Sequence, residues 1–311
     1  MATAPSSINR YFFQDTNTFH EEIVALHDFV LPTATALWTF RKLIEREFEE
    51  DPTTTVSALS AKYNNAPGTR ESTNLVVPFR NHTWEMQRER LAEVALVNII
   101  ALFEMWCDDI CEIFGKEKLA AELQYPTNNT VSHGIRFALQ ELRVNGSVIL
   151  SNSIQTTLVQ GRKYSLASLD NLLRCYRYFK ELRNCLMHRG RECDGKLWGA
   201  QSAFIPVASA PALGMDFVPE HLIFKRGDQV HLSLHGVLGF TDVILRIATT
   251  VNAELVATLA GEQVLIERIK SNTQIPVRPE KIPSLFTTLG WTGATLTPDL
   301  LNFLRQSGAV I

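Results

Sequence analysis

The sequence predicts a mainly α-helical protein with a small β element toward its C-terminal end. Apolar residues recur at helical spacing in several long segments, and glycine or proline stands where those segments stop. Only a few short runs after residue 195 have a β-like composition. With 311 residues, the chain is long enough for one large domain or for a central domain elaborated at both ends.

The overall composition is that of an ordinary globular protein. Hydrophobic residues make up 45% of the chain and charged residues 20%, which argues against global disorder. The net charge of -3 gives no general reason to expect a nucleic-acid partner. We see no secretory signal, and the apolar segment LAEVALVNIIALFEMWC contains Glu93, Asn98 and Glu104. We therefore expect a cytoplasmic protein that does not enter a membrane.

The five cysteines are expected to be reduced and buried. Their number is odd, and four of them lie in apolar helical patterns. Cys107 and Cys111 share a helical face, and Cys185, His188 and Cys193 are close in sequence, so a zinc site is an alternative. No paired C-x2-C knuckles are present, and we expect neither a metal nor a cofactor.

Residues 1–75 are predicted to form an N-terminal helical extension. FHEEIVALHDFVLPTATALWTFRKLIEREFEED has helical apolar spacing, and Pro32 is expected to divide or kink this helix. The polar segment DPTTTVSALSAKYNNAPGTREST indicates a long connection and a candidate boundary.

Residues 76–192 are predicted to contain two long helices. The first runs from Thr83, a candidate cap, to Gly115, and its apolar stripe is Leu91, Ala95, Ile99, Leu102, Trp106 and Ile110. A short helix around HGIRFALQELRV follows. The second long helix ends at His188 or the next residue, with Gly190 placed for a left-handed cap. Its buried side is expected to be Leu172, Cys175, Phe179, Leu182 and Leu186.

Residues 193–311 are predicted to form an α+β elaboration. SAFIPVA, HLIFKRG and QVHLSLHG are β-like runs, and Arg-Gly-Asp at 226–228 indicates a hairpin turn. A long apolar helix is expected from about Phe240 to Leu259, followed by a tail with proline and glycine and a final short helix.

The stretch ELRNCLMHRG, at the end of the second long helix, holds the candidate functional residues. An Arg followed by four residues and a His also occurs at Arg226 and His231, so the spacing alone carries little information. In a helix, however, Asn184 and His188 can meet on one face, where the amide can orient the imidazole. Arg183 can reach the same pocket and offer its planar guanidinium to a phosphate.

Local charge favours a phosphate-bearing partner at the same place. Between Gly161 and Arg191 there are eight basic and two acidic residues, so the local charge is 8 − 2 = +6. The basic residues are Arg162, Lys163, Arg174, Arg177, Lys180, Arg183, Arg189 and Arg191. Four of them, from Arg174 to Arg183, follow a three-residue spacing and form a ridge that would attract a phosphate backbone. We expect Arg177, Lys180 and Arg189 to contact RNA.

The motif LRNCLMH resembles the signature of HEPN domains, which are helical bundles. In that signature an Arg, four to six residues and a His close a long helix, often with Asn directly after the Arg. The resemblance covers residues 76–192, with LVNIIALFEMWCDDICEIF as the partner helix, and is nearest to the HEPN proteins of bacterial toxin and phage-defence systems. It implies a HEPN-type helical bundle.

The resemblance also implies a function. Many HEPN proteins are metal-independent endoribonucleases that act as homodimers with two facing motifs. Arg183 would stabilise charge on the scissile phosphate, Asn184 would order the site, and His188 would move the proton of the 2′-OH or of the leaving oxygen. The products would carry 2′,3′-cyclic phosphate and 5′-OH ends. A cognate antitoxin or regulator would be a further partner.

Three alternatives stay open at this level. The chain could be a catalytically silent HEPN module that binds RNA, a nucleotide or a partner protein. It could be a zinc-stabilised regulatory protein. The acidic row Glu104, Asp108 and Glu112, joined by Asp109, could pair with the basic ridge, lie beside the active pocket or support a two-metal nuclease, although no second acidic motif accompanies it.

Overall fold

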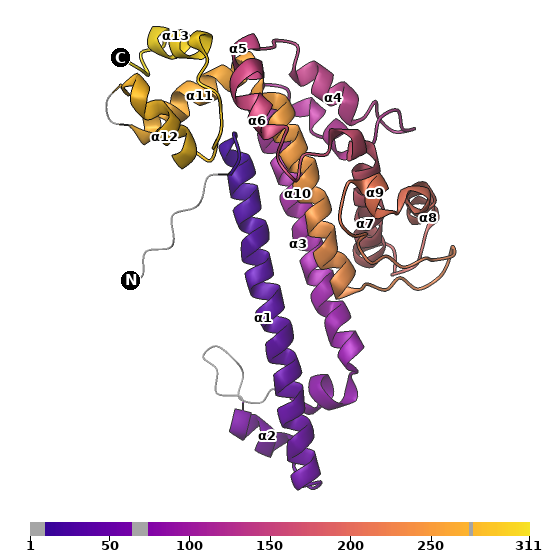
Figure 1. The fold of residues 1–311 in the computed structure, drawn as a ribbon. Coiled ribbons are helices and arrows are strands. Elements are labelled where there is room, and N and C mark those ends of the chain that lie inside the picture. The colour runs from indigo at the N-terminus through magenta and orange to yellow at the C-terminus, as the bar shows by residue number, and fades with distance from the viewer. Residues whose placement is uncertain (1–9, 64–73, 274–275) are drawn as a thin grey trace.

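The computed structural model describes residues 10–63, 74–273 and 276–311, and it is built of packed helices (Figure 1). Three long helices form its centre: α1 (Gln14–Glu50), α3 (Trp84–Ile113) and α10 (Leu234–Val256). The ring of Phe19 in α1 lies 6.2 Å from that of Phe103 in α3, and His27 Nε2 lies 3.0 Å from Thr241 Oγ1 in α10. The helix α1 therefore packs against both of the others.

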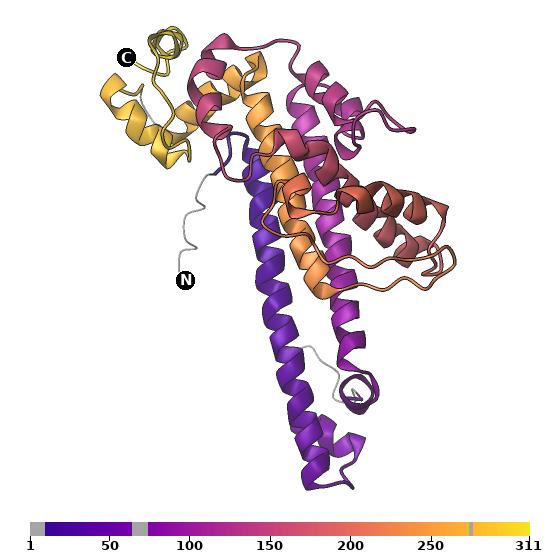
Figure 2. The same ribbon diagram turned by 45° about the vertical axis from the view of Figure 1, so that its right-hand side comes forward.

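A second layer covers one side of this centre. The helix α7 (Leu169–His188) packs against α3 and α10, and α8 (Gly195–Phe204) packs on α7 (Figures 1 and 2). The other α-helices are α2 (Val56–Tyr63), α4 (Ile135–Leu142), α5 (Val148–Leu150), α6 (Thr156–Leu158), α9 (Ala210–Leu213), α11 (Leu259–Asn272), α12 (Ile282–Thr288) and α13 (Pro298–Gln306). The short 3-10 and π segments are η1 (Val77–Asn81), η2 (Glu117–Leu119), η3 (Glu122–Gln124), η4 (Ser151–Gln155), η5 (Leu166–Ser168), η6 (Ile205–Val207) and η7 (Pro279–Lys281).

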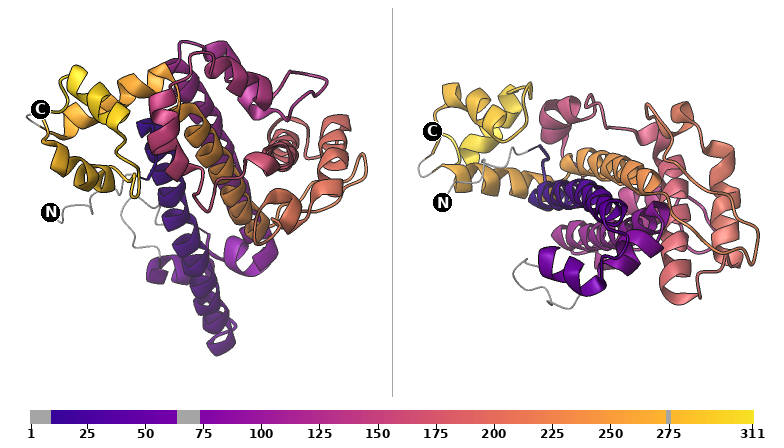
Figure 3. Two further views of the ribbon diagram at one scale, coloured as in Figure 1. Left: turned by 45° about the horizontal axis from the view of Figure 1, so that its top comes forward. Right: turned by 90° about the horizontal axis from the view of Figure 1, so that it is seen from below.

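One hydrophobic core draws on all three predicted segments, because α10 from the C-terminal segment lies between α1 and α7 (Figure 3). Phe179 of α7 stacks on Phe240 of α10 with ring centroids 4.4 Å apart, and Tyr176 lies 4.8 Å from Phe103 of α3. A separate small cluster around Ile44 holds α2 and η1 against the far end of α1. Aromatic packing of this kind buries large apolar areas and fixes helix positions.

The mainly helical character, the predicted start of α3 and the predicted end of α7 are confirmed. The helix α3 begins at Trp84, where the Thr83 hydroxyl accepts a hydrogen bond from the Met86 amide at 3.2 Å. The helix α7 ends at His188, and Gly190 has a φ of +65° in the predicted left-handed cap. Both predicted apolar stripes are buried, apart from Leu102 and Leu186, which are half-buried.

Two predictions for the N-terminal segment need correction. Pro32 lies inside a continuous α1 and does not divide it, because the helix carries on through Glu50. The polar segment after α1 is not wholly a connection, since residues 56–63 form α2. Residues 64–73 of that segment lie outside the described residues.

The predicted small β element is not found in the described part of the chain. SAFIPVA was wrongly predicted as β and forms the end of α8 and η6. HLIFKRG has no regular secondary structure and ends in a turn, and a side chain satisfies part of its backbone, since Gln201 bonds both the N–H and the carbonyl of Phe224. Only a bridge between Glu192 and Gln229 occurs there. A turn is present at Arg-Gly-Asp, where the Asp228 amide donates a 3.1 Å hydrogen bond to the Lys225 carbonyl, but the predicted hairpin is not found because no strands flank the turn in the described residues.

Among the described residues, two helices, α1 and α10, are long and apolar enough to cross a membrane, judged only by length and composition. The apolar window of α10 is 72% buried, as expected for a core helix. The window of α1 is only 11% buried, and Val24, Phe29, Leu31 and Trp38 are exposed on this helix. The core helix of a soluble protein meets the same criteria, so length and apolar composition do not assign α1 or α10 to a membrane.

The first prediction concerns acid stability. Burial, followed by the charges of Arg10 and Lys163, lowers the pKa of His20 to about 4. In the unfolded chain the pKa of His20 has its ordinary value of 6.5. Between pH 4 and pH 6.5 the unfolded chain therefore binds more protons than the folded protein. The free energy of unfolding consequently falls as the pH drops from 6.5 toward 4. Because His20 is only half-buried, we expect a loss on the order of 1 kcal/mol.

The measurement is urea denaturation at pH 7 and pH 5. The His20→Gln variant is expected to lose less stability over this interval than the wild-type protein. The exposed His235 provides the control, since His235→Gln should keep the wild-type pH dependence. An unchanged pH dependence in His20→Gln would contradict the assignment.

Candidate functional site

One side of α7, from Arg174 onward, lines a cleft of about 570 Å³. Its other walls are α8 and the segment that follows η3. The residues of α7 and its C-cap that line it are Arg174, Arg177, Lys180, Glu181, Asn184 and Arg189. Four of the six predicted site residues therefore line one cleft: Asn184 and the three predicted RNA contacts Arg177, Lys180 and Arg189.

Local backbone interactions shape the walls of this cleft. The Asp170 carboxylate at the start of α7 accepts a hydrogen bond from the Thr127 amide at 2.7 Å. This bond holds the loop that follows η3 against α7. Gly134 closes this loop with a φ of +79°, and a Cβ there would lie 2.2 Å from the Pro126 carbonyl oxygen. On the opposite wall, Gly195, Gly199, Ala200 and Ala203 leave room above α7. The cleft therefore depends on small residues at both walls.

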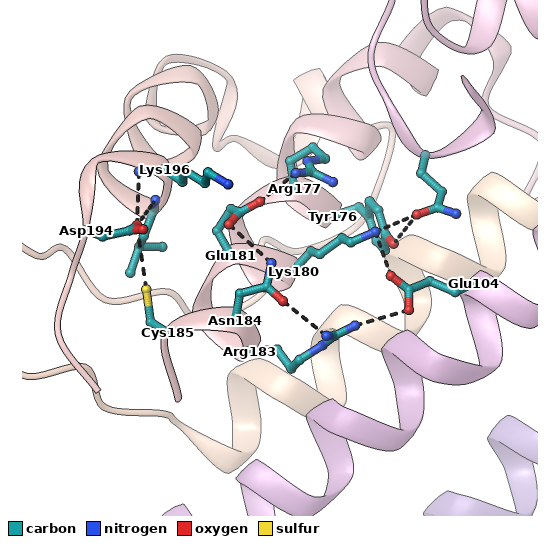
Figure 4. A network of polar contacts seen from close by, with 12 residues as sticks. Glu104, Tyr176, Arg177, Lys180, Glu181, Arg183, Asn184, Cys185, Asp194 and Lys196 are labelled. Atoms are coloured by element: carbon teal, nitrogen blue, oxygen red, sulfur yellow. Dashed lines mark hydrogen bonds and ion pairs between the residues drawn. The ribbon is translucent and has the colours of Figure 1, made fainter. Parts of the chain in front are cut away.

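Glu181 organises the α7 side of the cleft (Figure 4). The residue is only 4% exposed, and Arg177 Nη2 lies 2.6 Å from its Oε1. Arg189 Nη1 and Asn184 Nδ2 lie 3.1 Å and 3.2 Å from its Oε2. A buried carboxylate needs such partners to offset the loss of hydration. Glu181 therefore holds three predicted site residues in place, a role the sequence prediction did not assign to it.

Glu104 of α3 binds Lys180 and Arg183, two of the four residues of the basic ridge (Figure 4). Its two carboxylate oxygens lie 2.6 Å from Lys180 Nζ and 3.1 Å from Arg183 Nη2. Lys180 also donates to Gln124 Oε1 at 2.6 Å. The acidic row was expected either to pair with the basic ridge or to lie beside the pocket, and Glu104 pairs with the ridge. This ion pair holds Arg183 toward α3, and Arg183 does not line the cleft.

The three predicted catalytic residues are not gathered in one place. Asn184 lines the cleft, and its amide oxygen accepts a 3.1 Å hydrogen bond from Arg183 Nη1. His188 is exposed in the last turn of α7 and does not line the cleft. Within the described residues no hydrogen bond joins Asn184 to His188, because Glu181 and Arg183 already engage the amide.

Several basic groups that line the cleft have hydrogen-bond donors available for an anion. Five basic residues and one acidic residue line it, a formal charge of 5 − 1 = +4. Among the described side chains, Arg174 bonds only the Asn171 amide oxygen, and exposed Lys196 has no ion pair. Arg177 Nη1 is buried without a described hydrogen-bond partner. These donors suit a phosphate or another multivalent anion.

Two lining residues were missed by the sequence analysis. Tyr125 contributes an aromatic ring, with the Arg177 guanidinium 4.2 Å from its centroid. Lys196 is brought in by α8, whose first turn is capped by Asp194 through bonds from the Lys196 and Leu197 amides. The Asp-Gly-Lys sequence at 194–196 is a recognisable helix start, but only the packing of α8 on α7 directs it to the cleft.

All five cysteines are buried, as expected. Burial raises the pKa of each thiol, most clearly for the fully enclosed Cys107 and Cys175, so the thiolate needed by a metal or for nucleophilic attack is disfavoured. In the described ranges no group of three or more His, Cys, Asp or Glu side chains is placed to hold a metal ion. The zinc alternative gains no support from this arrangement.

A comparison of the chain with models of protein families, with curated proteins and with solved structures finds no match. The function therefore has to be argued from the cleft and from the motif at the end of α7.

The second prediction concerns Glu181. Replacing it with Ala leaves Arg177 and Arg189 partly buried without their shared carboxylate, and we expect the free energy of unfolding to fall by about 3 kcal/mol. Chemical denaturation followed by circular dichroism measures the loss. Glu192→Ala, at an exposed position just after α7, is the control and should cost less than about 0.5 kcal/mol. Equal effects of the two substitutions would contradict the role of Glu181.

Proposed function

We propose that this protein is an endoribonuclease that binds RNA in the cationic cleft and cleaves it without a metal ion. The observation that carries the proposal is the set of unused cationic donors in the cleft, on the helix that ends in the HEPN-like motif. A phosphate backbone would be attracted to these donors. Tyr125 adds an aromatic face of the kind on which bases stack. An activity as a toxin or phage-defence effector rests on the resemblance alone.

The proposed chemistry uses the exposed end of α7. His188 would accept the proton of the ribose 2′-OH as its oxygen attacks the adjacent phosphorus, and the P–O5′ bond would break. The leaving oxygen would take up a proton, which gives a 2′,3′-cyclic phosphate and a 5′-OH end. Arg183 would have to exchange Glu104 for the phosphate, and Asn184 would keep the arginine oriented through its present hydrogen bond.

A second candidate is a module that binds RNA or a nucleotide without cleaving it. It is favoured by the ion pair that engages Arg183 and by the absence, within the described residues, of a hydrogen bond between Asn184 and His188. In this case the cleft would be the binding site, and the exposed imidazole would have no catalytic part. The two candidates share the cleft and differ only in whether His188 acts on the ligand.

The third prediction tests cleavage. Purified wild-type protein in excess EDTA should cut total RNA to products with cyclic-phosphate and 5′-OH ends, and His188→Ala should reduce the rate by at least about 100-fold because the proton acceptor is lost. His235→Ala, another exposed histidine, is the matched control and should cut normally. Cleavage by His188→Ala at the wild-type rate would rule out the proposed mechanism. Binding without cleavage by any of the proteins would favour the second candidate.

The fourth prediction tests the cleft itself. The double variant Arg174→Ala and Lys196→Ala should bind single-stranded RNA at least about tenfold more weakly, with a salt dependence reduced by one to two ions, roughly as expected for two lost phosphate contacts. Fluorescence anisotropy over a salt series measures both. Arg162→Ala removes a highly exposed cation outside the cleft lining and serves as the control. Equal losses in both proteins would show that binding does not depend on the cleft.

A further inference from the structure

A pocket separate from the cleft lies where the start of α1, the end of α3 and α11 meet (Figure 1). We name it the α11 pocket; it is lined by residues 13–15, by Ile113 and by residues of α11 between Ala260 and Arg268. Its volume of about 380 Å³ is at the lower end of the range of roughly 300–1,000 Å³ that small-molecule sites span. It shares no lining residue with the cleft on α7, so its chemistry has to be read separately.

A buried arginine lines the α11 pocket without an acidic partner. Arg268 is only 8% exposed, and in the described part of the chain it forms no ion pair. Its Nη1 donates to the carbonyls of Tyr11 and Phe12, whereas its Nε and Nη2 make no described hydrogen bond. The Trp291 ring lies 5.0 Å from the guanidinium but supplies no negative charge.

The charge of Arg268 is therefore not compensated by the fold. Burial lowers the pKa of Arg268 to about 10, and no neighbouring carboxylate acts against this shift. The side chain is still protonated at neutral pH. Because a buried charge is costly unless it is paired, this side of the pocket favours an anionic group.

The start of α1 favours an anionic group at the same place. Its N-cap residue Phe13 has no side-chain oxygen to accept a hydrogen bond from the first turn. The backbone amides of Gln14, Asp15 and Thr16 make no described hydrogen bond, and the first two of these residues line the pocket. Such amides, together with the dipole of a 37-residue helix, attract a carboxylate.

Two carboxylates in the lining disfavour a ligand that carries only negative charge. Glu267 is exposed and Asp15 is half-buried, and neither forms an ion pair with a described residue. With Arg268 they give the lining a formal charge of 1 − 2 = −1. The negative potential extends to α3, since burial and then the charge of Asp15 raise the pKa of Asp109. A ligand with an ammonium group beside its carboxylate would be attracted by both sets of charges.

The rest of the lining is mostly apolar. Besides the three charged residues, the pocket is lined by two glutamines and by four apolar residues, namely Phe13, Ile113, Ala260 and Val264. An aliphatic or aromatic side chain would lose its hydration by packing on these residues. The pocket therefore combines a position for a carboxylate, a position for an ammonium group and an apolar wall.

We propose that the α11 pocket binds a free α-amino acid with an apolar side chain. The carboxylate of the ligand binds Arg268 and the first-turn amides of α1, and its ammonium group faces Asp15 and Glu267. Its side chain packs on the apolar wall. The inference does not depend on RNA binding or cleavage, since none of these residues belongs to the cleft or to the motif at the end of α7.

The fifth prediction compares three ligands by isothermal titration calorimetry on the whole chain. L-Leucine should bind. 4-Methylpentanoate, which lacks the ammonium group, and 3-methylbutylamine, which lacks the carboxylate, should each bind at least about tenfold more weakly, because each leaves one set of charges unpaired. Failure of both L-leucine and L-phenylalanine to bind at millimolar concentrations would overturn the proposal. Equal affinities for L-leucine and 4-methylpentanoate would overturn the assignment to an amino acid.

Two substitutions at the rim and wall place the ligand without disturbing the hydrogen bonds of Arg268. Glu267→Gln should weaken binding of L-leucine and strengthen binding of 4-methylpentanoate, each by about threefold or more, because it removes a negative charge beside the ligand. Glu280→Gln, at an exposed position outside the lining, is the matched control and should change neither affinity. Val264→Trp should fill the pocket and abolish binding while the circular dichroism spectrum stays that of the wild type.

Arg268→Lys tests the group that binds the carboxylate. It keeps the positive charge but removes the planar guanidinium, and it should weaken binding of L-leucine by at least about tenfold. Circular dichroism shows whether this variant still folds. If Val264→Trp bound L-leucine with the wild-type affinity, the amino acid would bind elsewhere and the proposal would be wrong.

Discussion

The aromatic contacts that hold α7 against α3 and α10 are the interaction on which the candidate site depends. Phe179 stacks on Phe240, and Tyr176 packs against Phe103, so α7 is fixed from two sides. The rotation of α7 about its axis follows from these contacts. Once that rotation is set, Arg174, Arg177 and Lys180 can only project away from the core, toward α8 and the loop after η3. The cleft is thus a consequence of core packing.

Two carboxylates then pair with three of the four residues of the basic ridge and with Arg189. Glu104 takes up Lys180 and Arg183, and Glu181 takes up Arg177 and Arg189. A guanidinium has more donors than one carboxylate can satisfy, and Arg177 keeps a buried Nη1 without a described partner. Charge compensation therefore stabilises the bundle while leaving donors for an anion. The same pairing engages Arg183, so the proposed binding of RNA and the proposed cleavage of RNA make different demands on this side chain.

The sequence by itself determined the helical class, the start of α3 after its cap Thr83, the end of α7 at His188 just before Gly190, and most of the buried faces. Capping and apolar periodicity are local, and they can be recognised without knowing the partner of a helix. It also identified the basic ridge, which is a property of spacing along one helix.

Only the tertiary structure decided which of the basic residues are neutralised. Glu104 lies 79 positions before Arg183, and their ion pair arises because α3 packs beside α7. The failure of the predicted β element has the same origin, since the side chains of Gln201 and Tyr178 satisfy the backbone near Phe224 in place of a neighbouring strand. Likewise, Lys196 reaches the cleft only because α8 packs on α7. Contacts between distant segments depend on how the helices pack, and a local sequence pattern does not contain that information.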